Sequence, residues 1–150
     1  MDSGAPSASA RRLKEALEYE RNLLACLSTV LDDERAAFLA RDADQIAAIS
    51  RQKQSALEAL ATASDQSRNL LAQSGGLRSK QSDIGPECKA LLTQLRAAWK
   101  AAQLSNQRNS AVMKIHQASV LRGLGVLRQA VGLAETYRAD GRAGGHYLSA

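Results

Sequence analysis

The chain has 150 residues, of which 45% are hydrophobic but only 3% aromatic, and its formal net charge is +5. This length fits one domain with a buried core, and a composition rich in Ala, Leu, Gln, Arg and Ser favours long helices and disfavours a β-rich fold. The first 76 residues hold 9 basic and 11 acidic side chains and the rest hold 11 and 4, so the positive second half suits an acidic partner or a nucleic acid.

The first predicted helix covers about residues 10–41, after a segment 1–9 whose Gly, Ala, Pro and Ser content predicts disorder. Its apolar residues recur in alternating steps of three and four, which is typical of a helix packed in a coiled coil. Glu20 and Glu34 occupy two positions of this repeat, and we expect them to pair with a cation of a neighbouring helix or to oppose a wrong register. The apolar positions are Leu13, Leu17, Leu24, Leu27, Leu31 and Phe38.

A second helix is predicted over about residues 43–74. Asp42 fits its N-cap and Gln45 its third position, a variant of the capping box, and Gly75-Gly76 is a helix stop. Lys53 falls on the apolar repeat, where we expect its ammonium to extend to solvent. The apolar positions are Ile46, Ile49, Leu57, Leu60 and Leu71.

A third helix is predicted to start at Pro86, after a polar connection over residues 77–85. Trp99 is expected to be a core anchor, with an exposed partner-binding anchor as the alternative. Asn106 and Asn109 both fall on the repeat, either to control register within the bundle or to hydrogen-bond an incoming helix or peptide. The repeat positions are Cys88, Leu92, Leu95, Trp99, Ala102, Asn106, Asn109, Met113, His116, Val120, Leu124, Leu127 and Val131.

The predicted lengths define the architecture. Residues 10–41, 43–74 and 86–118 would each be on the order of 47 Å long at about 1.5 Å per residue, which predicts an all-α fold with long antiparallel helices in a helical hairpin or three-helix coiled-coil bundle over residues 10–118. Residues 119–138 form a C-terminal helical extension with no partner helix in the chain, and residues 139–150 a flexible tail. The exposed apolar stripe of this extension predicts an interaction site.

Motifs for nucleotide binding, zinc proteolysis or serine hydrolysis are absent from the sequence, so we expect no enzyme activity, no cofactor and no metal. His116 is expected to be a helix-packing histidine rather than a ligand or a base. The acidic run from Asp32 to Glu34 is expected to face solvent, because consecutive helical residues point in different directions.

The two thiols, Cys26 and Cys88, have no metal-site or disulfide spacing, and we expect them to fill sites for small apolar residues in a reducing compartment. The first residues contain no apolar run of a secretory signal, and no window approaches a membrane span. A soluble, cytoplasmic protein without stable membrane insertion is therefore expected.

The order and spacing of these residues carry a family resemblance. The chain resembles the FlgN-type flagellar export chaperones. Their signature has L, E, L, D, I, I, K and L in this order, and it is matched by Leu31, Glu34, Phe38 (in place of the second L), Asp42, Ile46, Ile49, Lys53 and Leu57. The later residues similar to the C-terminal half of that family are Asn106, Asn109, Leu124, Leu127, Tyr137 and Gly141. The resemblance covers roughly residues 13–141.

The resemblance implies a cytoplasmic, non-enzymatic helical chaperone. Such proteins bind the C-terminal helical regions of the two hook–filament junction (hook-associated) proteins, prevent their premature association and aid their delivery to the flagellar export apparatus. The client-binding part of the family corresponds here to Asn106 onwards. The partner-binding residues expected on this basis are Asn106, Asn109, Met113, His116, Val120, Leu124, Leu127, Val131 and Tyr137.

Two other classes of function compete with this one. A structural coiled-coil scaffold without a client would bury the C-terminal stripe between copies, and homo-oligomerisation is left open. A basic helical nucleic-acid-binding protein would show steep salt dependence, but the few aromatic residues and the dispersed arginines argue against it.

Overall fold

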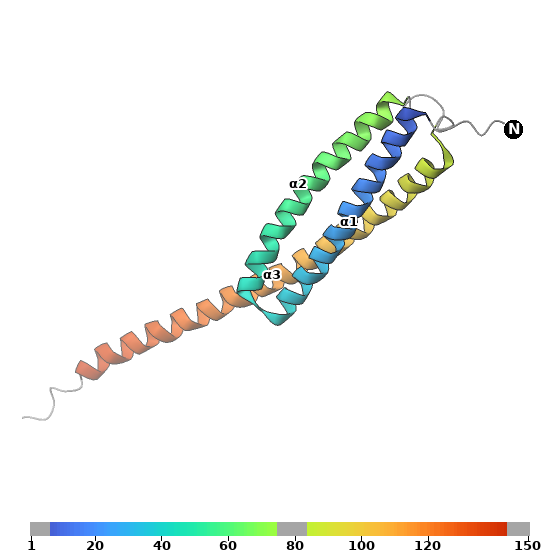
Figure 1. Cartoon of the computed structure of the whole chain (residues 1–150). Helices are drawn as coiled ribbons and strands as arrows, with labels where there is room; N and C mark the ends of the chain where they lie inside the picture. Colours follow the sequence, from blue (N-terminus) through green and yellow to red (C-terminus); the bar gives the residue numbers. More distant parts are fainter. Residues whose placement is uncertain (1–6, 75–83, 144–150) are drawn as a thin grey trace, which may run out of the picture. The chain divides into compact units, whose positions relative to one another are not determined.

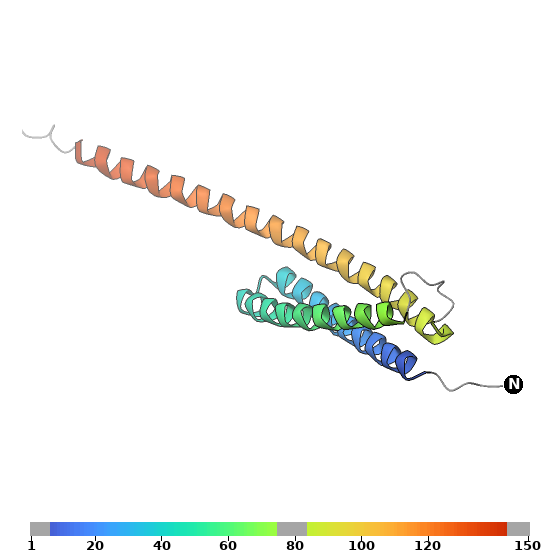
Figure 2. The ribbon, with the colours of Figure 1, turned by 90° about the horizontal axis from the view of Figure 1, so that it is seen from above.

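The computed structural model describes residues 7–74 and 84–143, with side chains up to Val131. It contains three helices, α1 (Ala8–Ala40), α2 (Ala43–Gln73) and α3 (Pro86–Ala143), and no strand in the described segments. The all-α prediction is confirmed. Successive helices of the bundle run in opposite directions, so α1 and the first part of α3 are parallel (Figures 1 and 2).

The helix ends follow local capping chemistry. The Ser7 hydroxyl accepts a hydrogen bond from the Ala10 N–H at 3.2 Å, which starts α1 slightly earlier than predicted. The Asp42 carboxylate accepts from the Gln45 N–H at 3.0 Å, which confirms the predicted cap of α2. Helix α3 continues to Ala143, so residues 139–143 of the predicted flexible tail are helical. The rest of that tail, the segment 1–6 and most of the 77–85 connection lie outside the described residues.

The reversal between α1 and α2 is made by only two residues. Arg41 adopts a left-handed conformation with φ of 56° and ends α1, and Asp42 caps α2. The Arg41 N–H donates to the Phe38 carbonyl and the Asp42 N–H to the Ala37 carbonyl, each at 3.2 Å, which is the Schellman pattern. Arg41 is the one non-glycine residue with positive φ among the described residues, so this turn stores backbone strain.

We therefore expect Arg41→Gly to raise the free energy of unfolding by about 0.5–1 kcal/mol, because glycine adopts this conformation without a Cβ clash. Arg41→Ala is the control, since it removes the same exposed side chain but keeps the Cβ. Urea unfolding would measure both variants. Equal gains for glycine and alanine would show that the arginine side chain, and not its backbone, is the source of strain.

The core lies along α1 and extends to one face of each neighbouring helix. Leu13, Leu17 and Leu31 of α1 and Leu60 of α2 are at most 1% exposed. Burying each such leucine contributes roughly 1.5–3 kcal/mol. The buried cluster consists of Leu13, Leu17, Leu24, Leu27, Leu31, Leu60, Ile84, Cys88, Leu91, Leu95 and Ala102.

Contacts between α1 and α3 fix their parallel register. Lys14 Nζ lies 2.7 Å from Glu87 Oε2, and the Arg21 guanidinium donates to the Gln94 amide at 3.4 Å, so both pairs join residues 73 apart in the sequence. The Glu87 carboxylate raises the pKa of Lys14, and the ammonium in turn lowers the pKa of Glu87. Both side chains are well exposed, so this pair marks the register more than it stabilises the fold.

The two cysteines are free thiols in different surroundings. Cys88 is buried next to the Ala10 carbonyl, which lies 3.9 Å from its sulfur, and burial raises the pKa of this thiol. At neutral pH it is therefore a small protonated core residue, as expected. Cys26 is exposed, contrary to the expectation of an apolar site.

The chain divides into two units. Residues Met1–Ser110 form the first, which holds α1, α2 and the beginning of α3, and we call it the bundle. Residues Ala111–Ala150 form the second, which continues α3 and which we call the extension.

Candidate functional site

A buried polar cluster joins all three helices near the end of the bundle. It consists of Glu34 from α1, Lys53 from α2 and Asn109 from α3. Glu34 is 5% exposed and Asn109 is 1% exposed. Lys53 Nζ lies 2.9 and 3.0 Å from the two carboxylate oxygens of Glu34, so one ammonium neutralises one carboxylate inside the bundle.

The position of Lys53 corrects the sequence prediction. Its side chain is only 19% exposed and its ammonium turns inward to Glu34 instead of extending to solvent. The physical reason is that a carboxylate faces it from the repeat of α1, and a buried charge requires a partner. This pairing confirms one of the two roles expected for Glu34. Glu20, in contrast, accepts from a neutral donor, the Trp99 indole N–H, at 3.0 Å.

Asn109 bonds to two acceptors at once. Its Nδ2 donates to the Leu31 carbonyl at 2.7 Å and to Glu34 Oε2 at 2.9 Å. Because both neighbours are acceptors, they fix the orientation of the amide. Its Oδ1 is buried and has no hydrogen-bond partner among the described residues. Asn109 therefore belongs to the bundle interior and is withdrawn from any partner surface of the free protein.

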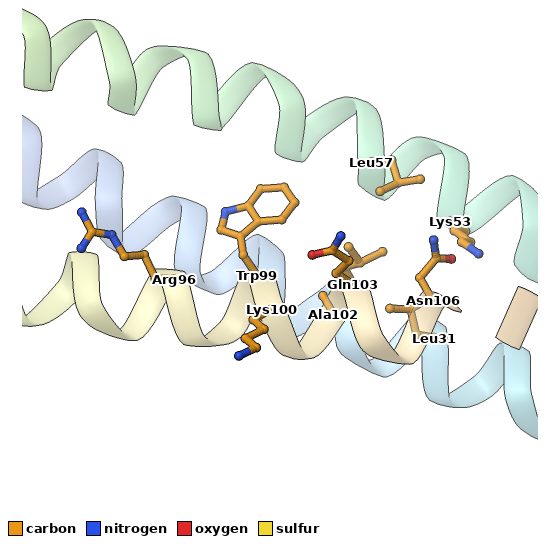
Figure 3. Close-up of a pocket in the computed structure, with 10 residues that line it drawn as sticks. Leu31, Lys53, Leu57, Arg96, Trp99, Lys100, Ala102, Gln103 and Asn106 are labelled. Atoms are coloured by element: carbon orange, nitrogen blue, oxygen red, sulfur yellow. The ribbon is translucent and has the colours of Figure 1, made fainter. Parts of the chain in front are cut away.

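Asn106, three residues earlier, is in a different environment. It is exposed and lines a hollow of about 500 Å³ together with Trp99 of α3, Lys53 and Leu57 of α2 and Leu31 of α1. Figure 3 shows Trp99 and Asn106 pointing from α3 toward α2, with Leu57 pointing back. The heptad pattern placed both amides on one apolar repeat, but in the structure Asn109 is buried and Asn106 lies at the surface.

Trp99 is not the core anchor that the sequence predicted. It is 37% exposed and lies between α2 and α3 at the wall of this hollow. Only its indole N–H is engaged inside the bundle, with Glu20. The facing repeat position on α2 also stays open, since Leu57 is 40% exposed. The alternative, an exposed aromatic anchor, therefore agrees with the observed position.

The predicted stripe of the extension is exposed along its described length. Every side chain from residue 117 to residue 131 is exposed, and Val120, Leu124, Leu127 and Val131 range from 47% to 62%. At 100° per residue these four point to one face of the helix. Met113 is 39% exposed and His116 is half-buried. Tyr137 belongs to α3, but its side chain lies outside the described ones.

Sequence reasoning missed three further apolar residues of the extension. Ile115, Leu121 and Val126 are 64–69% exposed and lie outside the predicted stripe. Leu121 borders the stripe, while Ile115 and Val126 face away from it. The sequence VLRGLGVL at residues 120–127 contains more apolar residues than one helix face can hold. A prediction of one stripe includes only some of them. A helix with apolar residues on several sides is normally covered on more than one side.

The described segments show neither a metal site nor a membrane span. No three His, Cys, Asp or Glu side chains gather closely enough there to hold a metal ion. None of the described helices contains a stretch long and apolar enough to cross a membrane.

These features define a class. The protein has long helices, a polar cluster inside the bundle and a helix whose apolar side chains are exposed. Such an exposed apolar helix is typical of proteins that bind other helices. The FlgN protein family model matches residues 1–145 of the chain. The chain therefore belongs to the FlgN family, a family of flagellar export chaperones. Comparison with curated proteins and with solved structures gave no match.

Proposed function

We propose that this chaperone binds the C-terminal helical regions of the hook–filament junction proteins in the cytoplasm, prevents their premature association and aids their delivery to the export apparatus. Family membership supports the chaperone role. The observation that supports helical clients is the exposed apolar surface of the extension, which includes Val120, Leu124 and Leu127. Junction-protein ends that assemble with each other must have amphipathic helices whose apolar faces are exposed before assembly. A chaperone helix with exposed apolar side chains can cover these faces.

The proposed client surface differs from the sequence expectation at two points. It leaves out Asn109, because the bundle already engages this amide. It adds Leu121, Ile115 and Val126, whose exposure gives the extension apolar groups on several sides. We infer that a client surrounds the extension with more than one helix, since one helix covers only one face.

Basic side chains of the extension contribute to recognition. Lys114, Arg122 and Arg128 are exposed among its apolar residues. Cations at the rim of an interface raise the association rate with acidic partners and increase its salt dependence. They suit clients whose helical ends carry Asp and Glu beside their apolar faces.

Removing the extension tests the proposal. We expect the chain shortened to residues 1–119 to keep its helical bundle and to lose binding of the junction-protein C-terminal segments, because the bundle has its own core. Circular dichroism and calorimetric titration would measure folding and binding. A shortened chain that still forms the complex would contradict the proposal. Sedimentation of the full chain would separate it from a client-free scaffold, which requires strong self-association through the stripe.

A further inference from the structure

A groove runs along the bundle between α2 and α3, apart from the extension. The hollow of about 500 Å³ described above is followed by a second one of about 170 Å³, and both are lined by Arg96 and Trp99. The second hollow reaches Leu71 near the end of α2. We call the two hollows together the α2/α3 groove. All of its lining residues belong to the bundle.

The groove is apolar at its floor. Leu27, Leu31 and Leu17 of α1 form the floor and are at most 3% exposed. Trp99 and Leu57 stand on the walls and remain 37% and 40% exposed. Along α2 the lining extends from Lys53 to Leu71, about 27 Å at about 1.5 Å per residue, which is five turns of a helix. Its length and apolar floor match an amphipathic helix laid between α2 and α3.

The walls of the larger hollow are basic. Among its described lining residues none is acidic and three are cations, Lys53, Arg96 and Lys100. The smaller hollow adds Glu20, which is buried and accepts from the Trp99 indole, and Arg68, which is paired with Asp65. Lys53 is neutralised by Glu34. Neither Arg96 nor Lys100 forms an ion pair within the described segments, and Lys100 points away from α2 at the outer edge (Figure 3). Unpaired cations beside an apolar floor are complementary to an apolar helix flanked by carboxylates.

We propose that the α2/α3 groove is a second docking site, which binds an acidic amphipathic helix of another protein. The groove shares only Asn106 with the residues expected to bind clients and uses none of the extension, so the site goes beyond the proposed function. A second copy of this chain is a poor occupant, because the exposed apolar surface of its extension carries Lys114, Arg122 and Arg128 and would bring cations to cations. The incoming helix would place leucine or aromatic side chains against Trp99 and Leu57, and carboxylates near Arg96.

A designed peptide tests the site in the full chain. The probe is a helical peptide of about 18 residues with leucines at one face, flanked by glutamates, and without tryptophan. Trp99 is the single tryptophan of the chain, so its fluorescence reports occupancy of the groove directly. We expect a blue shift that saturates with the glutamate peptide and a dissociation constant at least about tenfold weaker for the same peptide with lysines.

Charge variants localise the binding. Arg96→Glu combined with Lys100→Glu is expected to weaken the glutamate peptide at least about tenfold. Arg51→Glu combined with Lys89→Glu is the matched control, because both residues are exposed and lie outside the groove lining while the change in net charge is identical. This control should stay within about twofold of the unmodified chain.

Several results would overturn the proposal: equal binding of both peptides, equal weakening by both charge variants, or no fluorescence change. A dimer in sedimentation that Leu57→Glu dissociates would identify a second copy as the occupant and would also overturn it. Leu124→Glu with Leu127→Glu separates the two sites. This variant should keep peptide binding even if client binding is lost, so failure of one proposal leaves the other testable.

Discussion

Replacement of Leu124 and Leu127 by glutamate should weaken client binding at least about 100-fold while the bundle remains folded. Covering each leucine with a client helix contributes roughly 1.5–3 kcal/mol, and loss of both corresponds to two or more orders of magnitude in the dissociation constant. Both side chains are about half exposed in the free protein, so their replacement leaves the core intact. Calorimetric titration with the junction-protein C-terminal segments would measure the loss.

The matched control adds the same charge to the other side of the helix. Ala118→Glu and Gln129→Glu place two carboxylates opposite the stripe, at exposed positions of the same segment. This control should weaken binding by less than about tenfold. If both double variants lose binding equally, the stripe contributes no more than the opposite face or the net charge, and the assignment of Leu124 and Leu127 as the main client contacts fails.

Asn109→Asp should lower the free energy of unfolding by about 3 kcal/mol, although the two side chains have almost the same shape. The substitution replaces a donor by a carboxylate oxygen that faces the Leu31 carbonyl and the Glu34 carboxylate, at 2.7 and 2.9 Å. Two hydrogen bonds are lost and two negative charges meet in a buried site that contains one ammonium, from Lys53. Urea unfolding at neutral pH would measure the change.

Asn106→Asp is the matched control, because the same atoms change three residues away on an exposed side chain. We expect a change within about 0.5 kcal/mol. Adding Glu34→Gln to Asn109→Asp should recover most of the stability, since it restores one negative charge beside Lys53 and supplies a donor. Similar losses for Asn106→Asp and Asn109→Asp would contradict the separate environments assigned to the two amides.

The polar cluster also explains why one register is preferred. Sliding α3 against α1 would leave Glu34 and Lys53 with an incomplete set of hydrogen bonds and Asn109 against apolar neighbours. A buried polar group penalises such mispairing more than it adds to stability. The register role weighed for the asparagines therefore fits Asn109, and the partner-facing role fits the exposed Asn106.

The helices could be predicted because their signals are local. Steps of three and four along α1 identified its buried face, and Asp42 with Gln45 identified the start of α2 within a residue. The exposed stripe of the extension followed from counting helix lengths. The resemblance to the FlgN family, inferred from the order of residues along the sequence, agrees with the match of the family model over residues 1–145.

Tertiary packing decided which positions of the heptad repeat are buried, because the repeat alone does not distinguish between them. Asn106 and Asn109 both fall on the repeat of α3, as do Trp99 and Leu95. Yet one residue of each pair is buried, and the other is exposed at the larger hollow of the α2/α3 groove. A repeat identifies the face that a helix turns inward, but not the distance to the neighbouring helix at each turn. Because α2 and α3 leave a hollow over α1, the repeat positions Trp99 and Leu57 stay partly exposed. Because Glu34 faces Lys53, the ammonium that was predicted to extend to solvent turns inward.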